Sequence, residues 1–519
     1  HRSEITGDHY PFGLSLFMRS ALIKQHGGSS ENGLLIHTLF DALREKIKQD
    51  PRYFSKLIEK YLLQNPHRVM VVLTPDDQME KKELEEERRR LDAIESRLDA
   101  EERTKLIEQA NRLRIFQAQQ ERADIDLLPK VTLEDASKKA REIALTEEAL
   151  GGLNLHHHNC FTNEICYADL LFSLPAIDKA DLPYVRLLSV ILPQIGTRQR
   201  NYENLLESFQ EHTGGISTYL TLQVQAENPH HYFPAIALRG KSLYRKMDKL
   251  FPLMTELASE ALFSDHDRLK EVLQKHLSSL ESNFNQNAIR YSTSLSSSCL
   301  SAPNVVSEAW WGLHYLHSMR EIVKSNQIEA LVEKLTSLYQ RLFTNGRPDL
   351  VLSIDQKAYD QLKAEEFYGL SSLQSREKTA WSGNYPLPHV SNQARLISSP
   401  VAFISKVFRT IPYIHPDAPA LRAASHLLEN VVLHKKIREE GGAYGGGAVS
   451  NGASGNFYFY SFRDPHIDAT IKAFEDSITT ISTQKFDAED LEEAKFEMIQ
   501  DLDAPISPGH RAETAYHWN

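Results

Sequence analysis

A chain of 519 residues is too long for one ordinary hydrophobic core, so we expect two to four domains. Its composition, with 41% hydrophobic and 25% charged residues, is typical of a soluble globular protein, and no stretch approaches the ~18 uncharged apolar residues that a membrane-spanning helix needs. The formal net charge of -11 argues against a nucleic-acid-binding protein, because such a protein needs a basic face.

The cysteines and the two ends of the chain bear on its compartment and its completeness. Cys160, Cys166 and Cys299 are too few for a disulfide framework and lack the paired spacing of a structural zinc site, which predicts a reducing compartment. The first residues lack the basic and apolar regions of a secretory signal. The chain starts without Met and stops at "AETAYHWN" inside a helical pattern, so we expect a piece of a longer protein.

Residues 75 to 124 form a charge-rich segment with one narrow apolar seam. Leu84, Leu91 and Leu98 recur every seven residues while acids and bases alternate on the other faces, a pattern typical of an exposed helix. Asp99 is placed to cap a second helix from about residue 101 to 120, which predicts two antiparallel helices. A solvated spacer without a partner fits most of this surface, but we expect the seam to pack on the same chain.

Segments on either side of this charge-rich segment resemble one another. "LLQNPHRVMVVLTPD" at 62–76 and "LFTNGRPDLVLSID" at 342–355 each end a helix, turn on Asn and enter a strand. Two longer segments, from Leu182 and from Ala418, each predict an amphipathic helix, a polar second helix, a Gly-Gly turn and an alternating strand. An acidic, helix-forming stretch follows each of them. We therefore predict an α+β fold built from repeated units.

Two histidine motifs are candidates for a metal site. "LNLHHHNCFTNEIC" contains His156, His157 and His158, but neighbouring residues of a strand point to opposite faces and cannot all reach one ion. "HLLEN" at 426–430 has the spacing of the H-x-x-E-H zinc motif, with Asn430 in place of the second histidine. One histidine and one carboxylate do not hold zinc, so this motif favours an ordinary helix face.

The stretch "REEGGAYGGGA" at 438–448 places five glycines around one tyrosine. A flexible loop is one interpretation, and a binding edge where Arg438 and Tyr444 face a ligand is the other. The spacing excludes a phosphate loop, since no G-x-x-x-x-G-K-[ST] is present and the alternation in "NFYFYSF" predicts a strand instead. The serine run "SLSSSCL" lacks a nucleophile-elbow pattern.

The residues "HKKIREEGGAYGGGA", with "FYFYSFRDP" after them, resemble the C-terminal half of the presequence-protease branch of the pitrilysin/insulinase zinc metallopeptidases. This resemblance spans essentially the whole chain. It implies repeated pitrilysin-like α/β domains, with mixed sheets packed against helices, plus a long helical hairpin. It divides the chain into the end of a second domain (1–75), the hairpin between two halves (76–128), a third domain (129–368) and a fourth domain (369–519), truncated at its C-terminus.

The resemblance also implies a function. Such proteins close two bowl-like halves around a chamber that degrades short unstructured peptides, with zinc bound by an N-terminal half that this chain does not include. Peptides and that half are the implied partners, without nucleic acid or membrane, and the chain itself is expected to hold no metal and to be inactive alone. The implied compartment is the cytoplasm in a bacterium, and the mitochondrial matrix or plastid in a eukaryote.

Specific residues follow from the same resemblance. Tyr444 is implied to donate its hydroxyl to the oxyanion formed at the peptide carbonyl, and Arg438 to orient the peptide. The implied substrate-binding residues beside them are Gly441, Gly442, Ala443, Gly445 and Arg463. We expect the glycines to let a substrate strand lie close to the sheet edge.

Two other functions stay open. One is a non-peptidase core or processing-partner subunit of the same superfamily, which keeps the fold without the chemistry. The other is a structural scaffold that uses the helical hairpin as a partner-binding arm.

Overall fold

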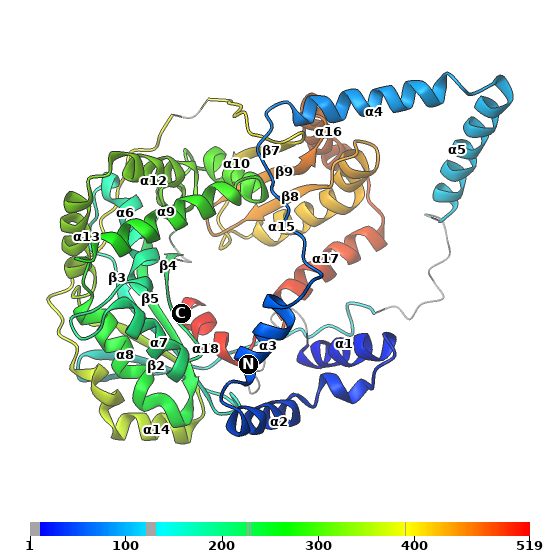
Figure 1. Ribbon diagram of the computed structural model, residues 1–519. Coiled ribbons are helices and arrows are strands. Elements are labelled where there is room, and N and C mark those ends of the chain that lie inside the picture. Colours follow the sequence, from blue (N-terminus) through cyan, green and yellow to red (C-terminus); the bar gives the residue numbers. More distant parts are fainter. Residues whose placement is uncertain (1–10, 121–130, 226–227, 229, 390, 519) are drawn as a thin grey trace. The chain divides into compact units, whose positions relative to one another are not determined.

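The computed structural model describes residues 11–120, 131–225, 228, 230–389 and 391–518 of the chain (Figure 1). One compact unit is formed by His1–Ser30 together with Lys138–Asn519, and a second by Glu31–Ser137. Within the described residues, all strands belong to the first unit, where they make two sheets. None of the helices in these residues is long and apolar enough to cross a membrane.

The larger sheet has six strands in the order β1-β2-β6-β3-β5-β4. Only β2 and β6 pair in parallel, so the sheet is mixed. The strands are β1 (Thr146–Leu150), β2 (Leu153–Asn159), β3 (Ile165–Ser173), β4 (Ile216–Val224), β5 (Tyr232–Leu243) and β6 (Asp349–Ile354). Strands with few polar residues, such as β3 and β6, lie in the middle, where both faces are covered.

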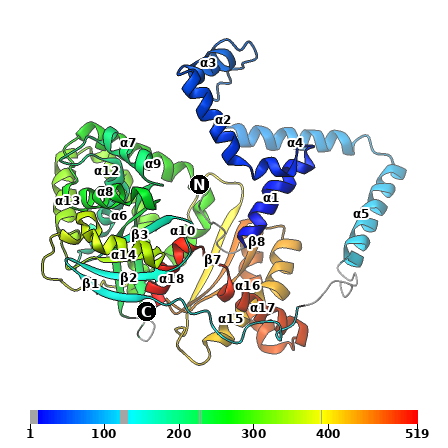
Figure 2. The same ribbon diagram turned by 90° about the horizontal axis from the view of Figure 1, so that it is seen from below.

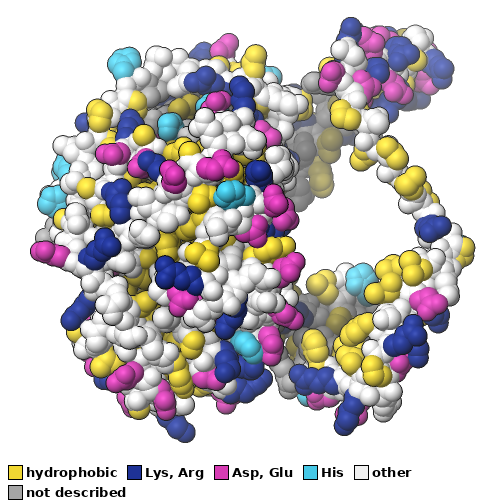
Figure 3. Space-filling model, turned by 60° about the vertical axis from the view of Figure 1, so that its left-hand side comes forward, with side chains coloured by type: hydrophobic (Ala, Val, Ile, Leu, Met, Phe, Trp, Pro, Cys, Tyr) yellow, Lys and Arg dark blue, Asp and Glu magenta, His cyan; other side chains and the backbone are white. Residues whose placement is uncertain are grey.

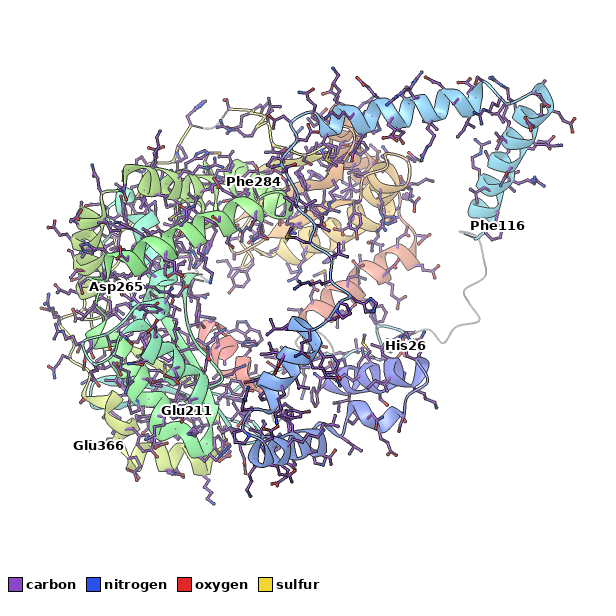
Figure 4. All side chains as sticks on the ribbon, viewed as in Figure 1. His26, Phe116, Glu211, Asp265, Phe284 and Glu366 are labelled. Carbon is purple, nitrogen blue, oxygen red and sulfur yellow. The ribbon has the colours of Figure 1, made fainter. Side chains whose placement is uncertain are left out.

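Helices cover one face of this sheet and build the main core, which includes Leu350, Leu352 and Trp310. They are α6 (Leu182–Ile191), α7 (Tyr202–His212), α8 (Met247–Glu260), α9 (His266–Ser282), α11 (Ala302–Trp311), α12 (Leu313–Ser325), α13 (Ile328–Leu342) and α14 (Gln356–Ala364), with short turns η4 (Lys179–Asp181), η5 (Leu192–Gln194), η6 (Tyr244–Lys246), η7 (Asn285–Asn287) and η8 (Glu366–Ser372). Between α9 and α11, α10 (Ala288–Ser297) instead packs on strands of the smaller sheet. Figure 4 labels Asp265, whose carboxylate accepts a hydrogen bond from the backbone of Arg268 and so begins α9.

The opposite face is covered by α18 (Pro508–Trp518), which returns from the end of the chain and lies beside β2, β3 and β6 (Figures 1 and 2). Ala512 packs there on Leu171, Ala237 and Val351. Because both faces are covered, β6 is buried along almost its whole length.

The smaller sheet has three antiparallel strands in the order β7-β9-β8, namely β7 (Ala402–Arg409), β8 (Gly445–Asn451) and β9 (Asn456–Asp464). It packs on α15 (Ala418–Leu427), η9 (Leu428–Glu439) and α16 (Asp468–Thr483), and α17 (Ala488–Asp503) packs on α15. Leu433, Ile437, Phe459 and Phe474 form its core. The acidic helices α9 and α17 follow the two sheet-forming segments as the sequence predicts, and the α+β fold class is confirmed.

The two repeated segments differ in their helices, which corrects the prediction. After Leu182 two helices, α6 with η5 and then α7, precede the Gly-Gly turn. After Ala418 a single helix runs from α15 into η9, because Leu428 at the junction keeps helical dihedral angles. The η9 part is a π-helix. π-Helical segments are rare, and most of them are single turns within α-helices.

The second unit contains helices and extended chain. Its helices are α2 (Ile36–Gln49), α3 (Tyr53–Ile58), η2 (Glu59–Leu63), α4 (Met79–Glu95) and α5 (Ala100–Gln120); α1 (Phe12–Gln25) and η1 (Ser30–Gly33) precede them. Asp99 and Glu102 accept hydrogen bonds from each other's backbone N–H, so the predicted cap of α5 is confirmed. Leu84 and Leu91 are exposed within this unit, and the expectation that their seam packs on the same chain stays a prediction.

A strand predicted within 62–76 is also missing from the described chain. Its counterpart at 342–355 does enter a strand, β6. Residues 67–75, in contrast, are assigned to no helix or strand and pair with no described strand. A strand needs a neighbour to satisfy its backbone groups, and no described segment supplies one.

Candidate functional site

The glycine-rich stretch lies where η9 ends and β8 begins, and it folds back on the last turn of the helix. The N–H of Gly442 donates to the carbonyl of Arg438 at 3.0 Å, and the N–H of Ala443 donates to the carbonyl of Ile437 at 3.0 Å. These bonds satisfy carbonyls that the helix end leaves without partners. Gly442 has a φ of +75°, in the left-handed region that glycine adopts without strain. We call Gly441 and Gly442 the second corner.

At two glycines of this stretch, Gly441 and Gly447, a side chain would clash with a neighbouring atom of the fold. A Cβ on Gly441 would lie 2.6 Å from the carbonyl oxygen of Ile437, and one on Gly447 would lie 2.3 Å from the carboxylate of Glu429. A Cβ on Gly445 would meet nothing within 4 Å. Of these three positions, only Gly445 is therefore open to a ligand. The side chain of Ala443 is buried, so that residue can offer only its backbone.

Tyr444 stands at the start of β8 with 66% of its surface exposed. Its N–H donates to the carbonyl of Arg463 at 3.3 Å, and its ring meets Phe462 edge-on with centroids 5.8 Å apart. The guanidinium of Arg463 lies 5.9 Å from the Tyr444 ring centroid. Arg463 has a φ of +52°, which is uncommon for a residue with a side chain. The structure thus brings Tyr444 and Arg463 together and fixes the ring of Tyr444.

Arg438 is exposed on the last turn of η9. Its guanidinium makes no hydrogen bond or ion pair with a described residue. The structure connects Arg438 to the corner through its backbone carbonyl and shows no contact between its side chain and Tyr444. The side chains of Arg438 and Tyr444 are each exposed to a ligand. Because they do not contact each other, one ligand would have to span the distance between them.

β8 is an edge strand of the smaller sheet in the described chain. An edge strand presents unpaired N–H and C=O groups to which another strand can add. One part of this edge is already used, because the N–H of Ala448 bonds to the carboxylate of Glu429. The remaining edge near Gly445 lies beside Tyr444 in the sequence.

The "HLLEN" motif lies on the helix that packs behind β8, and a distant residue joins it. Glu497 of α17 is 2.8 Å from Nδ1 of His426 and accepts a hydrogen bond from the amide of Asn430 at 3.0 Å. Burial raises the pKa of Glu429, which the hydrogen bond from Ala448 only partly offsets. The sequence pattern pointed to His426, Glu429 and Asn430, but nothing local indicated Glu497.

These residues do not fit a zinc ion. The amide of Asn430 occupies the position of a second histidine and donates its N–H to the carboxylate, whereas zinc prefers three or four ligands among histidine, cysteine and carboxylate. Among the residues that the structure describes, no group of three or more His, Cys, Asp or Glu could hold a metal ion.

The histidine run on β2 alternates as the strand geometry predicts. His157 is buried and stacks on Tyr359 of α14 with ring centroids 3.9 Å apart. His156 points to the other face, toward Tyr516 of α18, with ring centroids 4.8 Å apart. Cys160, just after the strand, is buried, and burial raises the pKa of its thiol to about 11.

A cavity that the sequence reasoning missed lies at the other Gly-Gly turn, Gly214 and Gly215, which we call the first corner. It has a volume of about 440 Å³, is partly open to solvent, and is lined on one side by the start of α18. Its lining includes Asp169, Arg239 and His510. The only sequence signal was the repeat itself, because these residues lie on separate elements.

The arginine in this cavity is neutralised by its neighbours. Arg239 pairs with Asp169 through Nε and Oδ1 at 2.7 Å, and with Glu513 of α18. Burial acts to raise the pKa of Glu513, but His517 and Arg239 outweigh it and hold that pKa at about 2. On the face drawn in Figure 3, Lys and Arg side chains are interspersed with Asp and Glu and form no continuous basic patch.

Comparison with solved structures identifies the fold. A conserved protein from Enterococcus faecalis V583 matches with a TM-score of 0.51 and 12% identity, over 68% of this chain and 84% of that chain. A protease from Helicobacter pylori matches with a TM-score of 0.50 and 11% identity, over 72% and 88%. Identities this low establish a common architecture only.

Sequence relatives match nearly the whole chain. The mitochondrial presequence protease of Drosophila melanogaster is 26% identical over 98% of this chain and 49% of the relative. Protein HypA of Clostridium perfringens is 25% identical over 98% of this chain and 52% of the relative. The chain therefore spans about half the length of the curated relatives it matches.

Two family models match adjacent parts of the sequence. The model of the domain associated with subfamily C of the M16 peptidases matches residues 73–322, and "Peptidase M16 inactive domain" matches residues 327–498. The second match contains the smaller sheet, both glycines of the second corner and Tyr444. Together with the presequence proteases that match along the whole length, these models show that the chain belongs to the peptidase M16 family.

Proposed function

We propose that this chain is the C-terminal half of a zinc metallo-oligopeptidase of the presequence-protease type, which degrades short unstructured peptides in a chamber closed by two halves. Its own role is to bind the peptide opposite the catalytic metal. Its compartment is the mitochondrial matrix or plastid in a eukaryote and the cytoplasm in a bacterium.

The observation that carries this proposal is the exposed Tyr444 beside the edge strand β8. Its ring is held by Phe462 and Arg463, while its hydroxyl makes no hydrogen bond with a described residue. A tyrosine that only packed the loop would bury its ring. The exposed hydroxyl supports a role in donating to a peptide oxygen outside the chain.

We assign two tasks to this chain: it stabilises the negative charge on the peptide oxygen, and it orients the peptide. When water adds to the scissile carbonyl, the carbonyl oxygen takes a negative charge, and the Tyr444 hydroxyl donates a hydrogen bond to it. The positively charged Arg438 and Arg463 orient the peptide backbone or its carboxylate. Gly445 leaves room for the peptide, and the backbone of Gly441, Gly442 and Ala443 shapes the corner.

Zinc belongs outside this chain in our proposal. The described residues do not fit the ion, because Asn430 and Glu497 bond to each other where ligands would be needed. We therefore expect residues 1–519 alone to lack peptidase activity, and the metal to be held by the other half of the protein.

The test is Tyr444→Phe in the full-length protein. If the hydroxyl acts on the oxyanion, kcat falls by roughly 10²–10³ and KM changes little, because the bond strengthens only in the transition state. Arg438→Ala raises KM as well, since it binds the peptide in the ground state. Tyr413→Phe, at another exposed tyrosine (53% exposed), is the matched control and leaves both constants unchanged.

Two results would redirect the proposal. A Tyr444→Phe protein with normal kcat and a lowered Tm would return Tyr444 to a packing role. A full-length protein that binds no zinc and cleaves no peptide would favour a non-peptidase partner subunit of the same family.

A further inference from the structure

A half-buried arginine of α6, Arg186, has no acid to pair with among the described residues. Its Nε is closed off from solvent and has no hydrogen-bond partner there. Its Nη1 donates to the hydroxyl of Ser189 at 3.1 Å, which leaves the Nε and Nη2 edge of the guanidinium unused. Burial lowers the pKa of Arg186, and no acid is among the neighbours that shift it. A cation taken out of water without a partner destabilises the fold, so a partner is expected.

The repeated segment from Ala418 shows an equivalent arginine with its acid. α6 and α15 both have proline as their second residue, arginine as their fifth and serine as their eighth. In both helices the serine hydroxyl donates to the carbonyl of the arginine at 2.7 Å, from Ser189 to Arg186 and from Ser425 to Arg422. Arg422 pairs through Nη2 with Asp501 of α17 at 2.9 Å. The repeat therefore predicts an acid beside Arg186.

The helix beside α6 supplies a histidine at this place. α9 follows the larger sheet as α17 follows the smaller one, and it packs on α6 (Figure 1). Burial, and after it the charge of nearby Arg186, lowers the pKa of His276 on α9 to about 4. His276 is therefore neutral at pH 7, and its Nε2 shares a hydrogen bond of 2.9 Å with the hydroxyl of Tyr315. This neighbour brings no negative charge to Arg186.

A second arginine adds to the positive charge. After burial, the charge of Arg290 on α10 is a further cause that lowers the pKa of Arg186. The guanidinium of Arg290 lies 5.5 Å from the ring centroid of Tyr291, and no described carboxylate pairs with it. α6, α9, α10 and α12 all belong to the first compact unit. Within the described part of that unit, two cations thus lie near each other without an anion.

We propose that Arg186 and Arg290 bind a carboxylate, which takes the role that Asp501 has in the other repeated segment. Its oxygens bond to the Nε and Nη2 edge of Arg186, the edge with which Arg239 holds Asp169 at 2.7 and 3.0 Å. Because Nε is closed off from solvent, the guanidinium turns outward as the carboxylate binds. The proposal does not depend on the proposed peptidase function, since none of these residues lies at the second corner.

The carboxylate has two possible sources, a small free acid and the C-terminus of a peptide. The experiment measures the thermal midpoint of residues 1–519 at pH 7 with acetate, with triglycine and with triglycine amide, against sodium chloride at equal ionic strength. Acetate or triglycine is expected to raise Tm in a saturable way, by about 2 °C at tens of millimolar, and triglycine amide is not. An equal response to acetate identifies small acids as sufficient, whereas a response to triglycine alone identifies the peptide C-terminus.

Four variants locate the site. Arg186→Met should abolish the rise and leave Tm without a probe unchanged or higher, because it removes an unpaired cation. Arg290→Met should raise the half-saturating concentration about threefold or more. His276→Asp should abolish the rise, since its own carboxylate pairs with Arg186, while the neutral control His276→Asn keeps it. Arg422→Met is the matched control on α15 and should also keep the rise.

Several results would overturn the proposal. One is a wild-type Tm that responds to neither carboxylate more than to chloride, and another is an unchanged response in Arg186→Met or Arg290→Met. A fall of several degrees in Arg186→Met without a probe would mean that an acid of the chain already pairs with Arg186. If His276→Asp is less stable than His276→Asn, a carboxylate on that side does not reach the guanidinium. Peptide cleavage is not read in this experiment, so its outcome is separate from the test of Tyr444.

Discussion

The two corners follow the same backbone plan. In each, the first glycine lets a neighbour approach, Lys241 beside Gly214 and the Ile437 carbonyl beside Gly441, and the second glycine has a positive φ. An edge strand follows in both, β4 after the first corner and β8 after the second. The turn is therefore a property of the repeated fold and by itself says nothing about function.

The side chains around the corners differ. At the first corner Arg239, opposite Ser217 of β4, is held by Asp169 and Glu513 under α18. At the second corner the guanidinium of Arg463 lies near two aromatic rings, those of Tyr444 and Phe462, and pairs with no described carboxylate. The arginine of the first corner serves folding, and that of the second is available for binding. If the second corner binds a ligand, we expect the neighbours of its glycines, and not the glycines themselves, to make the difference between the corners.

The largest effect that tests this comparison is Arg239→Met. It leaves the buried carboxylate of Asp169 without its cation and takes from Glu513 one of its two basic neighbours, which we expect to cost about 3–5 kcal/mol. The thermal midpoint of residues 1–519 should fall by about 5 °C. Arg463→Met is the control and should cost less than about 1 kcal/mol. Equal losses at the two positions would contradict the division of roles.

The corners also predict opposite responses to acid. The pKa of Glu513 is lowered in the fold, so its contribution is complete above its ordinary value of 4.5 and is lost as the pH falls toward 2. Its loss amounts to about 2–3 kcal/mol. Burial raises the pKa of Glu429, so that carboxyl binds a proton more readily when folded and favours folding as the pH falls.

The measurement compares unfolding of wild type, Glu513→Gln and Glu429→Gln at pH 5 and pH 3. Glu513→Gln should lose less stability than wild type on acidification, and Glu429→Gln should lose more. If both variants shifted the pH dependence in the same direction, the electrostatic contrast between the corners would be wrong.

A smaller difference in stability is expected when the first glycine of each corner, Gly441 or Gly214, is replaced by alanine. Gly441→Ala places a Cβ 2.6 Å from a backbone carbonyl that cannot move without distorting η9, and should cost about 2 kcal/mol. Gly214→Ala meets the Lys241 side chain at 2.9 Å, which can turn away, and should cost about 1 kcal/mol or less. Chemical denaturation followed by circular dichroism measures both, and a larger loss for Gly214→Ala would reverse the comparison.

The repeat, the helix caps and the strand alternation could be predicted from the sequence, because they depend on local patterns. Asp99 caps α5, and His156 and His157 lie on opposite faces of β2, as their spacing predicts. The pairing of Glu497 with His426 and the clamp of α18 on Arg239 depend on contacts across some 70 to 300 positions of sequence, which no local pattern encodes.

Two errors have the same origin. The polar stretch after residue 428 indicated a separate helix, but the chain between Leu427 and Leu428 has no break, so α15 continues. Residues 69–74 have a strand pattern, and the described chain has no partner strand for them. The local pattern predicts a strand for both copies of this segment. The copy at 349–354 has neighbouring strands and forms β6, whereas residues 69–74 have none in the described chain. Tyr444 and Arg438 as catalytic residues remain predictions.

The smallest effect concerns why the second corner is so rich in glycine. A Cβ at Gly447 would lie 2.3 Å from the Glu429 carboxylate, so Gly447→Ala must displace that carboxylate from the Ala448 N–H and should cost about 1–2 kcal/mol. Gly445→Ala should be nearly neutral, because nothing lies within 4 Å of the new Cβ. In a Glu429→Ala background the carboxylate is gone, and Gly447→Ala should then cost about 0.5 kcal/mol or less. If Gly447→Ala costs about 1–2 kcal/mol in that background as well, Gly447 is needed by the backbone of β8 and not by the approach of Glu429. A low kcat with normal stability for Gly445→Ala in the full-length protein would place the substrate at Gly445.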